Sequence, residues 1–357
     1  MTIHPAEFTI QSAAVRARFG AGLRRSVPKE LESLGIMRAL IVTGPRQAAL
    51  AAEMAEHCGP RCAGTFTEAA MHTPVAVSEQ ASELARALDA DGIVALGGGS
   101  AIGLGKAIAL RTGLAQIVLP TTYSGSECTA ILGQTENGVK TTLVDPKVQP
   151  GVILYDADLV TELPPELTAT SSLNAMAHAA EALYARDRSP LSSLMAMEGL
   201  RAFKTALPVV MAEPGNREAR GKTLYGAWLC GTVLGQVGMS LHHKLCHTLG
   251  GSFDLPHSDT HAIMLPHSIA FNARAVPDLL APVTEVFGGA DAGTGLWQFA
   301  KQVGAPLALR DLGVTAENLD RAADLAVANP YWNPREVSRE GVRALLQNAW
   351  EGTPPAA

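Results

Sequence analysis

Gly92-Ile-Val-Ala-Leu-Gly-Gly-Gly-Ser100 is the stretch of this 357-residue chain that decides its fold. Residues 92–96 are apolar enough to form a buried strand, and a helical pattern starts directly after Ser100. A helix that begins where a strand ends exposes unpaired N–H groups, and glycines let an anion approach them closely. The stretch therefore predicts a strand–turn–helix unit that binds a phosphate at Gly97, Gly98, Gly99 and Ser100.

The turn does not match two common phosphate-binding motifs. Ile102 stands where GxGxxG has its last glycine, and Ala107 follows Lys106 where a P-loop has serine or threonine. A tight turn that needs glycine for backbone reasons alone is therefore the alternative interpretation.

The residues around this unit alternate short β-branched runs with longer amphipathic stretches. We expect strands at 39–43, 92–96 and 116–119, and helices at 46–57, 77–90 and 100–111. Such alternation predicts an α/β fold with a parallel sheet covered by helices on both faces.

The second half of the chain has a different character. After a strand-like run at 152–155, helical spacing continues through 166–186, 191–206, 216–238 and parts of 295–350. The length also favours two domains. We expect a dinucleotide-binding α/β domain at 1–160 and an all-helical substrate domain at 161–357.

A hydroxyl-rich loop follows the expected strand 116–119. It contains Thr121, Thr122 and Ser124, and the carboxyl ends of neighbouring parallel strands open on the same crevice. Hydroxyls there can donate to phosphate oxygens or to a nicotinamide amide, although a simple polar turn is the alternative. Together with the glycine turn, the loop predicts a dinucleotide site.

Polar side chains recur at helical spacing in the second half. Asn174 precedes His178 by four residues, His243 precedes His247 by four, and His257 follows. Residues four apart share one helix face, so each pair can point at one place. Three interpretations stay open: satisfied core histidines, a divalent metal site, or a metal-free acid–base pocket.

Charge and composition exclude several classes of partner. The formal net charge is −6 and no cationic run exceeds two residues, which disfavours nucleic acid and anionic membranes as partners. The five cysteines form no CxxC pair, and residues 1–11 lack the pattern of a secretory signal. We expect a cytoplasmic protein without a membrane span.

These elements, in this order, resemble the iron-containing alcohol dehydrogenase family, which shares its fold with glycerol dehydrogenase and, more distantly, dehydroquinate synthase. The resemblance rests on residues 97–100, Pro120-Thr121-Thr122, 163–168, 174–181 and 243–257. It implies NADH or NADPH as cofactor, a homodimer, and metal-ligand positions at Asn174, His178, His243 and His257. His247 matches a histidine beside the nicotinamide.

Three positions depart from the family pattern. Asn174 replaces the acidic ligand, so the resemblance implies that a metal is bound weakly or is not required. Gly103 and Gly44 stand where the family often has aspartates that contact the cofactor, and Arg46 follows closely. Both NADH and NADPH are therefore expected as cofactors.

Within the family, residues 97–106, 174–178, 241–247 and 329–335 resemble the maleylacetate reductases. These enzymes reduce the carbon–carbon double bond of maleylacetate to 3-oxoadipate during bacterial breakdown of aromatic compounds. For that reaction we expect His243, with His178 and His257, to stabilise an enolate oxygen, and His247 or a neighbour to supply the proton. We expect Tyr123, Lys244 and Arg335 to bind the dicarboxylate, and Lys140 to serve the cofactor.

Three rival functions remain open from the sequence. The nearest is an alcohol dehydrogenase that depends on iron or zinc and accepts asparagine as a ligand. The second is a lyase similar to dehydroquinate synthase, and the third is a nucleotide-binding relative without catalysis.

Overall fold

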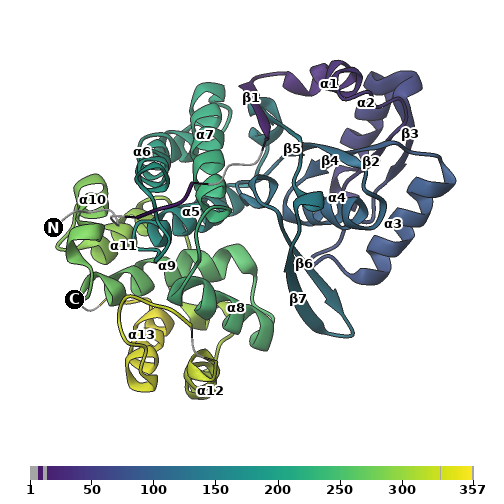
Figure 1. Ribbon diagram of the computed structural model, residues 1–357. Coiled ribbons are helices and arrows are strands. Elements are labelled where there is room, and N and C mark those ends of the chain that lie inside the picture. Colours follow the sequence, from purple (N-terminus) through teal and green to yellow (C-terminus); the bar gives the residue numbers. More distant parts are fainter. Residues whose placement is uncertain (1–6, 11–13, 330, 356–357) are drawn as a thin grey trace. The chain divides into compact units, whose positions relative to one another are not determined.

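The computed structural model describes residues 7–10, 14–329 and 331–355, and it divides the chain into two compact units (Figure 1). The first unit is Ser12–Leu163, and the second contains Pro164–Ala357 together with the residues before Ser12. The division therefore falls between Leu163 and Pro164, where we had expected a boundary near residue 160.

The first unit is built on a six-stranded parallel sheet, which confirms the expected α/β class. In spatial order its strands are β1 (Arg16–Gly20), β8 (Val152–Asp156), β5 (Ala115–Pro120), β4 (Gly92–Gly97), β2 (Ala39–Val42) and β3 (Cys62–Phe66). The four central strands are the apolar runs that the sequence identified. The edge strands β1 and β3 were not expected.

Alternation along each strand supplies a core on both faces of the sheet. Val94 and Leu96 pack with residues of α1 (Val27–Ser33) and α2 (Ala48–Cys58). Ile93 and Ala95 pack on the other face with α3 (Val75–Ala87) and α4 (Gly99–Thr112). The sheet is thus covered on both faces, as predicted.

A two-stranded hairpin stands beside the main sheet. It joins β6 (Ile131–Glu136) to antiparallel β7 (Val139–Val144). Asn137 and Gly138 form its turn with φ angles of 50° and 76°. Two left-handed residues in sequence are what a tight hairpin of this length requires.

The second unit is all-helical among its described residues. Its helices are α5 (Pro165–Ala182), α6 (Pro190–Ala212), α7 (Arg217–Leu234), α8 (Leu241–Phe253), α9 (His257–Ala273), α10 (Pro277–Phe287), α11 (Ala292–Gln302), α12 (Ala316–Val327) and α13 (Arg339–Glu351). Every residue of α5 from Thr168 to Ala182 is buried, so α5 forms the centre of the unit.

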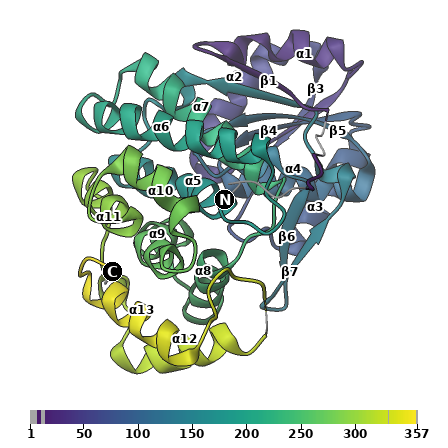
Figure 2. The same cartoon turned by 60° about the vertical axis from the view of Figure 1, so that its left-hand side comes forward.

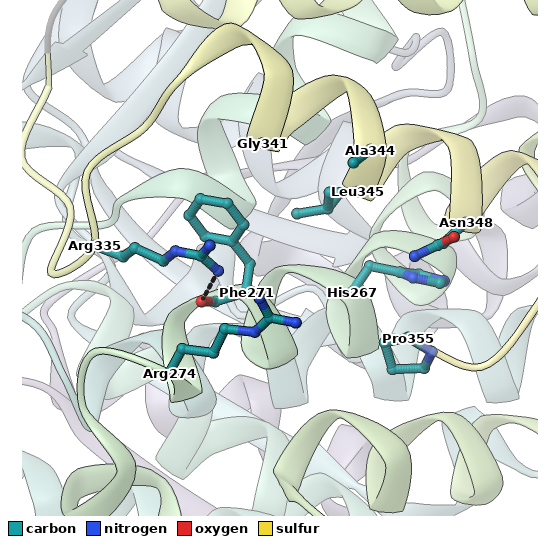
Figure 3. Close-up of a pocket in the computed structure, with 9 residues that line it drawn as sticks. All are labelled: His267, Phe271, Arg274, Arg335, Gly341, Ala344, Leu345, Asn348 and Pro355. Atoms are coloured by element: carbon teal, nitrogen blue, oxygen red, sulfur yellow. Dashed lines mark hydrogen bonds between the residues drawn. The ribbon is translucent and has the colours of Figure 1, made fainter. Parts of the chain in front are cut away.

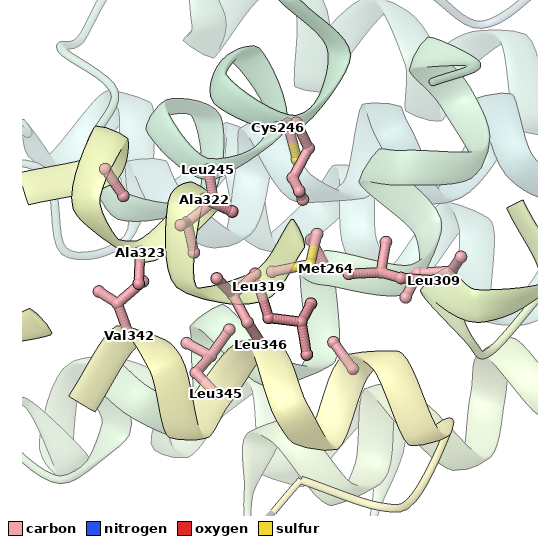
Figure 4. Packing of buried hydrophobic residues seen from close by; sticks show 14 of the residues in the cluster. Leu245, Cys246, Met264, Leu309, Leu319, Ala322, Ala323, Val342, Leu345 and Leu346 are labelled. Atoms are coloured by element: carbon pink, nitrogen blue, oxygen red, sulfur yellow. The ribbon is translucent and has the colours of Figure 1, made fainter. Parts of the chain in front are cut away.

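An apolar cluster in the second unit joins two of its middle helices to its last two. It contains buried residues of α8, α9, α12 and α13, of which Leu245, Met264, Leu319 and Leu346 are at most 1% exposed (Figure 4). Figure 2 shows these four helices gathered together. This cluster fixes α8 and α9, which carry most of the histidines. No helix in the described part of the chain is long and apolar enough to cross a membrane.

Candidate active site

The glycine turn lies where β4 ends and α4 begins. Gly97 has a φ of 149°, and a Cβ there would lie 2.7 Å from the Cβ of Ala101 and 2.9 Å from Oε1 of Gln47. A Cβ on Gly98 would come within 2.9 Å of the Thr122 side chain. Both positions need glycine, and the expected hydroxyl loop lies directly against the turn.

The strand order makes the carboxyl ends of β2 and β4 a topological switch point. The chain leaves β2 for β3 at one edge, returns to β4 on the other side of β2, and continues outward to β5. The connections therefore diverge at β2 and β4, which is where α/β sheets bind ligands. Gln47 spans the two ends, because its Nε2 donates to Oγ1 of Thr121 at 3.0 Å.

Lys106 fixes the hydroxyl loop through hydrogen bonds. The sequence did not reveal this role. The ammonium of this fully buried residue donates to the backbone oxygens of Ser126, Thr129 and Ile131 at 2.5, 2.7 and 2.8 Å, and to Oγ1 of Thr129 at 3.0 Å. Burial lowers the pKa of Lys106 to about 7, although the charge of Glu127 opposes the shift. Four oxygen acceptors favour the charged form.

A buried carboxyl completes this support. Glu127 accepts from the hydroxyl of Tyr155 at 3.0 Å and from Ser124 at 3.4 Å. Burial raises its pKa, against those hydrogen bonds and the charge of Lys106. Ser124 is thus tied to the buried end of the loop.

The remaining predicted residues of the first unit have varied surroundings. Tyr123 lies in the loop and is fully buried. Lys140 lies outside both loops, on β7 opposite Thr135. A Cβ on Gly103 would lie 2.4 Å from Oγ1 of Thr73, which explains why the aspartate common in the family has no room here.

In the second unit, α5 and α8 bring His178 and His243 together. Nδ1 of His178 lies 2.9 Å from Nε2 of His243. On its other side His243 meets a buried carboxylate, with 2.6 Å between its Nδ1 and Oε2 of Glu181. The three residues form one hydrogen-bonded line.

The carboxylate of Glu181 accepts hydrogen bonds from several donors. Besides His243 it accepts from the Tyr184 hydroxyl, from the backbone and hydroxyl of Ser240, and from the backbone N–H of His242, at 2.8–3.1 Å. Burial alone would raise its pKa, but the hydrogen bond and charge of His243 and the charge of His242 hold the pKa well below its usual range. Glu181 is therefore ionised, and Nδ1 of His243 carries the proton that it accepts.

Two further buried histidines lie beside this line. The hydroxyl of Ser268 donates to the Met264 carbonyl at 2.8 Å, so it accepts from Nδ1–H of His242 at 2.9 Å. Nε2 of His242 then accepts from Nδ1–H of His261, also at 2.9 Å. Burial, followed by the charge of His243, lowers the pKa of His242 to about 3, so this pair is neutral.

The other predicted residues lie around the same cluster. The ring of His247 is 6.2 Å from that of His243, and the ring of His257 is 4.3 Å from that of His261. Both His247 and His257 are exposed. Lys244, also on α8, places its ammonium 5.7 Å from the ring of Tyr331.

The structure tests whether the residues at the family's metal-ligand positions fit a dication. Asn174 offers a neutral amide, whose buried Oδ1 has no hydrogen-bond partner among the described residues. Glu181 is saturated by its five donors. Across the described chain, the group whose ligand atoms lie within 4.8 Å of one another is His242, Cys246 and His261.

His242 and His261 of this group already hydrogen-bond to each other, and His242 also to Ser268. None of the three residues stands at a position that matches a metal ligand of the family. Imidazole suits iron and zinc, but a set of three imidazoles and one neutral amide carries no negative charge, so we expect it to hold a dication less tightly than a set with a carboxylate. That the activity needs no metal stays a prediction.

Arg335 is not brought to the cluster around His178 and His243. Its guanidinium donates to the Phe271 carbonyl at 2.9 Å and lies over the Phe271 ring at 4.0 Å. Phe271 is ten residues beyond His261 on α9, which is roughly 15 Å along a helix. Glu181, His261 and Lys106 were missed because tertiary packing, not local spacing, gives them partners.

Comparison with known proteins agrees with this arrangement. Residues 14–157 match the model of the iron-containing alcohol dehydrogenases, and residues 168–350 match that of the C-terminal part of the Fe-containing alcohol dehydrogenase family. A maleylacetate reductase of Rhizobium sp. (strain MTP-10005) is 59% identical over 98% of this chain and 99% of its own. One of Sphingobium indicum is 49% identical over 98% and 99%.

The crystal structure of the maleylacetate reductase from Agrobacterium tumefaciens superposes with a TM-score of 0.96, at 57% identity, covering 98% of this chain and all of that one. The chain therefore belongs to the iron-containing alcohol dehydrogenase family, within the branch formed by its maleylacetate reductases.

Proposed function

We propose that this protein reduces the carbon–carbon double bond of maleylacetate to give 3-oxoadipate, with NADH or NADPH as the reductant. The observation that carries the chemistry is the line from Glu181 through His243 to His178. It provides an oriented imidazole for a substrate oxygen, and no carboxylate is left for a metal.

The reaction explains why such an imidazole suffices. The cofactor supplies a hydride, which adds to the carbon β to the ketone, so negative charge collects on the ketone oxygen as an enolate. An enolate is more stable than the alkoxide formed in carbonyl reduction, and hydrogen-bond donors placed in a buried site stabilise it strongly. Imidazole N–H groups can therefore take the part that a metal plays elsewhere.

The structure suggests a division of roles among the histidines. Because Glu181 holds the Nδ1 proton of His243, Nε2 of His243 and the adjoining Nδ1 of His178 share one exchangeable proton. We assign this proton, once the substrate oxygen replaces the hydrogen bond between the two rings, and the exposed His257 to the enolate. The exposed His247 supplies the proton to the α carbon, and Asn174 lies on the same helix face as His178.

The substrate's carboxylates need cations. Lys244 is the best placed, because it precedes the exposed His247 by three residues on α8 and so shares its side of the helix. Tyr123 is proposed as a hydrogen-bond donor to the substrate. The sequence favoured Arg335 as a ligand for a substrate carboxylate. Because its guanidinium lies against Phe271, we do not include it among the substrate-binding residues.

Both nicotinamide cofactors fit the first unit. The backbone N–H groups at residues 97–100 would hold the pyrophosphate, with Thr121, Thr122 and Ser124 nearby and Lys140 as a further cation. A Cβ at Gly44 would meet only the Ala69 carbonyl, at 3.5 Å. No aspartate is present there to repel a 2′-phosphate, so we expect NADPH to be accepted beside NADH.

The five cysteines are free thiols, which suits the cytoplasm, where we place the enzyme as a homodimer. The test follows NADH absorbance on addition of maleylacetate, with a simple aldehyde and a simple ketone in parallel. Oxidation with maleylacetate alone supports the proposal. Oxidation with the aldehyde or ketone alone would favour a metal-dependent alcohol dehydrogenase.

A further inference from the structure

A cavity of about 130 Å³ lies between α9 and α13 in the second unit (Figure 3). Its walls include His267 and Phe271 from α9, Arg274 directly after that helix, Leu345 and Asn348 from α13, and Arg335 from the segment before α13. An engineered cavity of similar size, ~150 Å³, holds a benzene molecule. The space therefore suits a small organic molecule.

Two guanidinium groups face this cavity without an acid among its lining residues. Burial, followed by the nearby charge of Arg274, lowers the pKa of Arg335. Like charges held close together repel each other unless an anion lies between them. Figure 3 shows Arg274 and Arg335 approaching the cavity from the same side.

His267 supplies an independent observation. It is 2% exposed, and neither of its ring nitrogens has a hydrogen-bond partner in the described structure. A buried polar group left unpaired is destabilising, so these nitrogens favour a polar partner. In Figure 3 its ring points toward Asn348 at the end of the cavity away from the arginines.

We propose that this cavity binds a small aliphatic dicarboxylate, one carboxylate at Arg274 and Arg335 and the other at His267 and Asn348. Phe271 and Leu345 offer apolar contacts for the carbon chain between the two ends. Guanidinium groups match a planar carboxylate through paired N–H donors. The site is separate from the substrate-binding residues proposed above. Arg274 follows His261 by thirteen residues, which corresponds to roughly 20 Å in the direction of α9.

The test uses adipate as the probe and the ring nitrogens of His267 as the reporter. Protein labelled with ¹⁵N-histidine is titrated with adipate, and the His267 signals are assigned by their loss in His267→Gln. Because adipate can also bind at the other histidines, only the His267 signals count. We expect them to shift saturably with adipate and much less with dimethyl adipate, which carries no charge.

Arg274→Met is the decisive variant, because Arg274 is exposed and its replacement spares the core. It should weaken the adipate effect about tenfold or more, the value of a charge-assisted hydrogen bond. Arg201→Met, at an exposed position on α6, should leave it unchanged. Unshifted His267 signals in the unmutated protein, or equal affinity in Arg274→Met, would overturn the proposal. Equal shifts with inorganic phosphate would also overturn it, by showing a site for any anion.

Discussion

His243 and Glu181 meet across 2.6 Å, and the carboxylate that receives the histidine's proton is itself held by four other donors. Glu181 thus acts as a positioning residue: it sets the tautomer of His243 and directs Nε2 toward His178. The arrangement resembles the carboxylate that orients a catalytic histidine in hydrolases.

Replacing Glu181 by glutamine should impair catalysis and folding together. The amide nitrogen would face N–H donors, and the tautomer of His243 would no longer be fixed. We expect kcat to fall roughly 100-fold or more while KM for NADH is unchanged, because orienting carboxylates of this kind matter mainly to the chemical step. Unfolding in urea should show a loss of about 1–3 kcal/mol.

Glu198→Gln, at an exposed position on α6, is the matched control and should leave both quantities unaltered. If Glu181→Gln kept its kcat, Glu181 would be a purely structural residue.

The stability of the protein should fall in mild acid because His242 is buried as a neutral ring. Its folded pKa is about 3, against 6.5 in an unfolded chain. As the pH falls through 6.5 the unfolded chain takes up a proton that the folded chain refuses until about pH 3. Its contribution is therefore complete above 6.5 and declines below, by at most about 1.4 kcal/mol per pH unit.

Urea unfolding at about pH 7.5 and about pH 5.5 measures this decline. His242→Gln should reduce the decline, and His57→Gln, at an exposed position, should not. Equal slopes in His242→Gln and the unmutated protein would contradict the assignment of a neutral His242.

Lys244 and Arg335 form a matched pair for locating the substrate's carboxylates. Lys244→Met should raise KM for maleylacetate about tenfold or more, because a charge-assisted hydrogen bond is lost. Arg335→Met should leave KM within about twofold, since its guanidinium packs on Phe271, which lies roughly 15 Å along α9 from His261. Steady-state kinetics of both variants decide the matter. A large rise in KM for Arg335→Met would restore Arg335 to the substrate-binding residues.

The close approach of Thr73 to Gly103 predicts a cost for even one methyl group. Gly103→Ala places a Cβ 2.4 Å from Oγ1 of Thr73, so we expect a loss of about 1–3 kcal/mol in urea unfolding. Gly221→Ala on α7, whose Cβ would meet nothing within 4 Å, should instead stabilise the protein by up to about 1 kcal/mol. Loss at both positions would mean that the helices, and not Thr73, are responsible.

Removal of metal should leave the activity intact. The residues matching the family's ligands offer three imidazoles and the amide of Asn174, while Glu181 is fully occupied. We expect protein dialysed against a chelator to keep its rate with maleylacetate. Metal content, measured by mass spectrometry, should not follow the rate. Loss of activity on chelation, restored by iron or zinc, would show that Asn174 acts as a ligand.

Sequence patterns predicted the centre of the fold better than its edges. The four central strands are apolar on both faces and stand out as β-branched runs, whereas β1 (RARFG) and β3 (CAGTF) carry small and charged residues. The hairpin β6–β7 was overlooked although Asn137-Gly138 is a strong turn signal.

The candidate site was predictable where it depends on spacing along one helix. His243 and His247, or Asn174 and His178, share a face because they are four residues apart. The partners of Glu181 and Lys106 come from other elements, and Arg335 could not be assigned to one pocket or another, since its residue type suits either. Packing decides those contacts.

The four oxygen acceptors around Lys106 have a thermodynamic consequence for the cofactor. A loop that is already tied down before the nicotinamide arrives does not have to be ordered by it. For cofactor binding at the proposed site, the entropic cost of association should then contain no term for ordering this loop, and the change in heat capacity should contain no contribution from its folding.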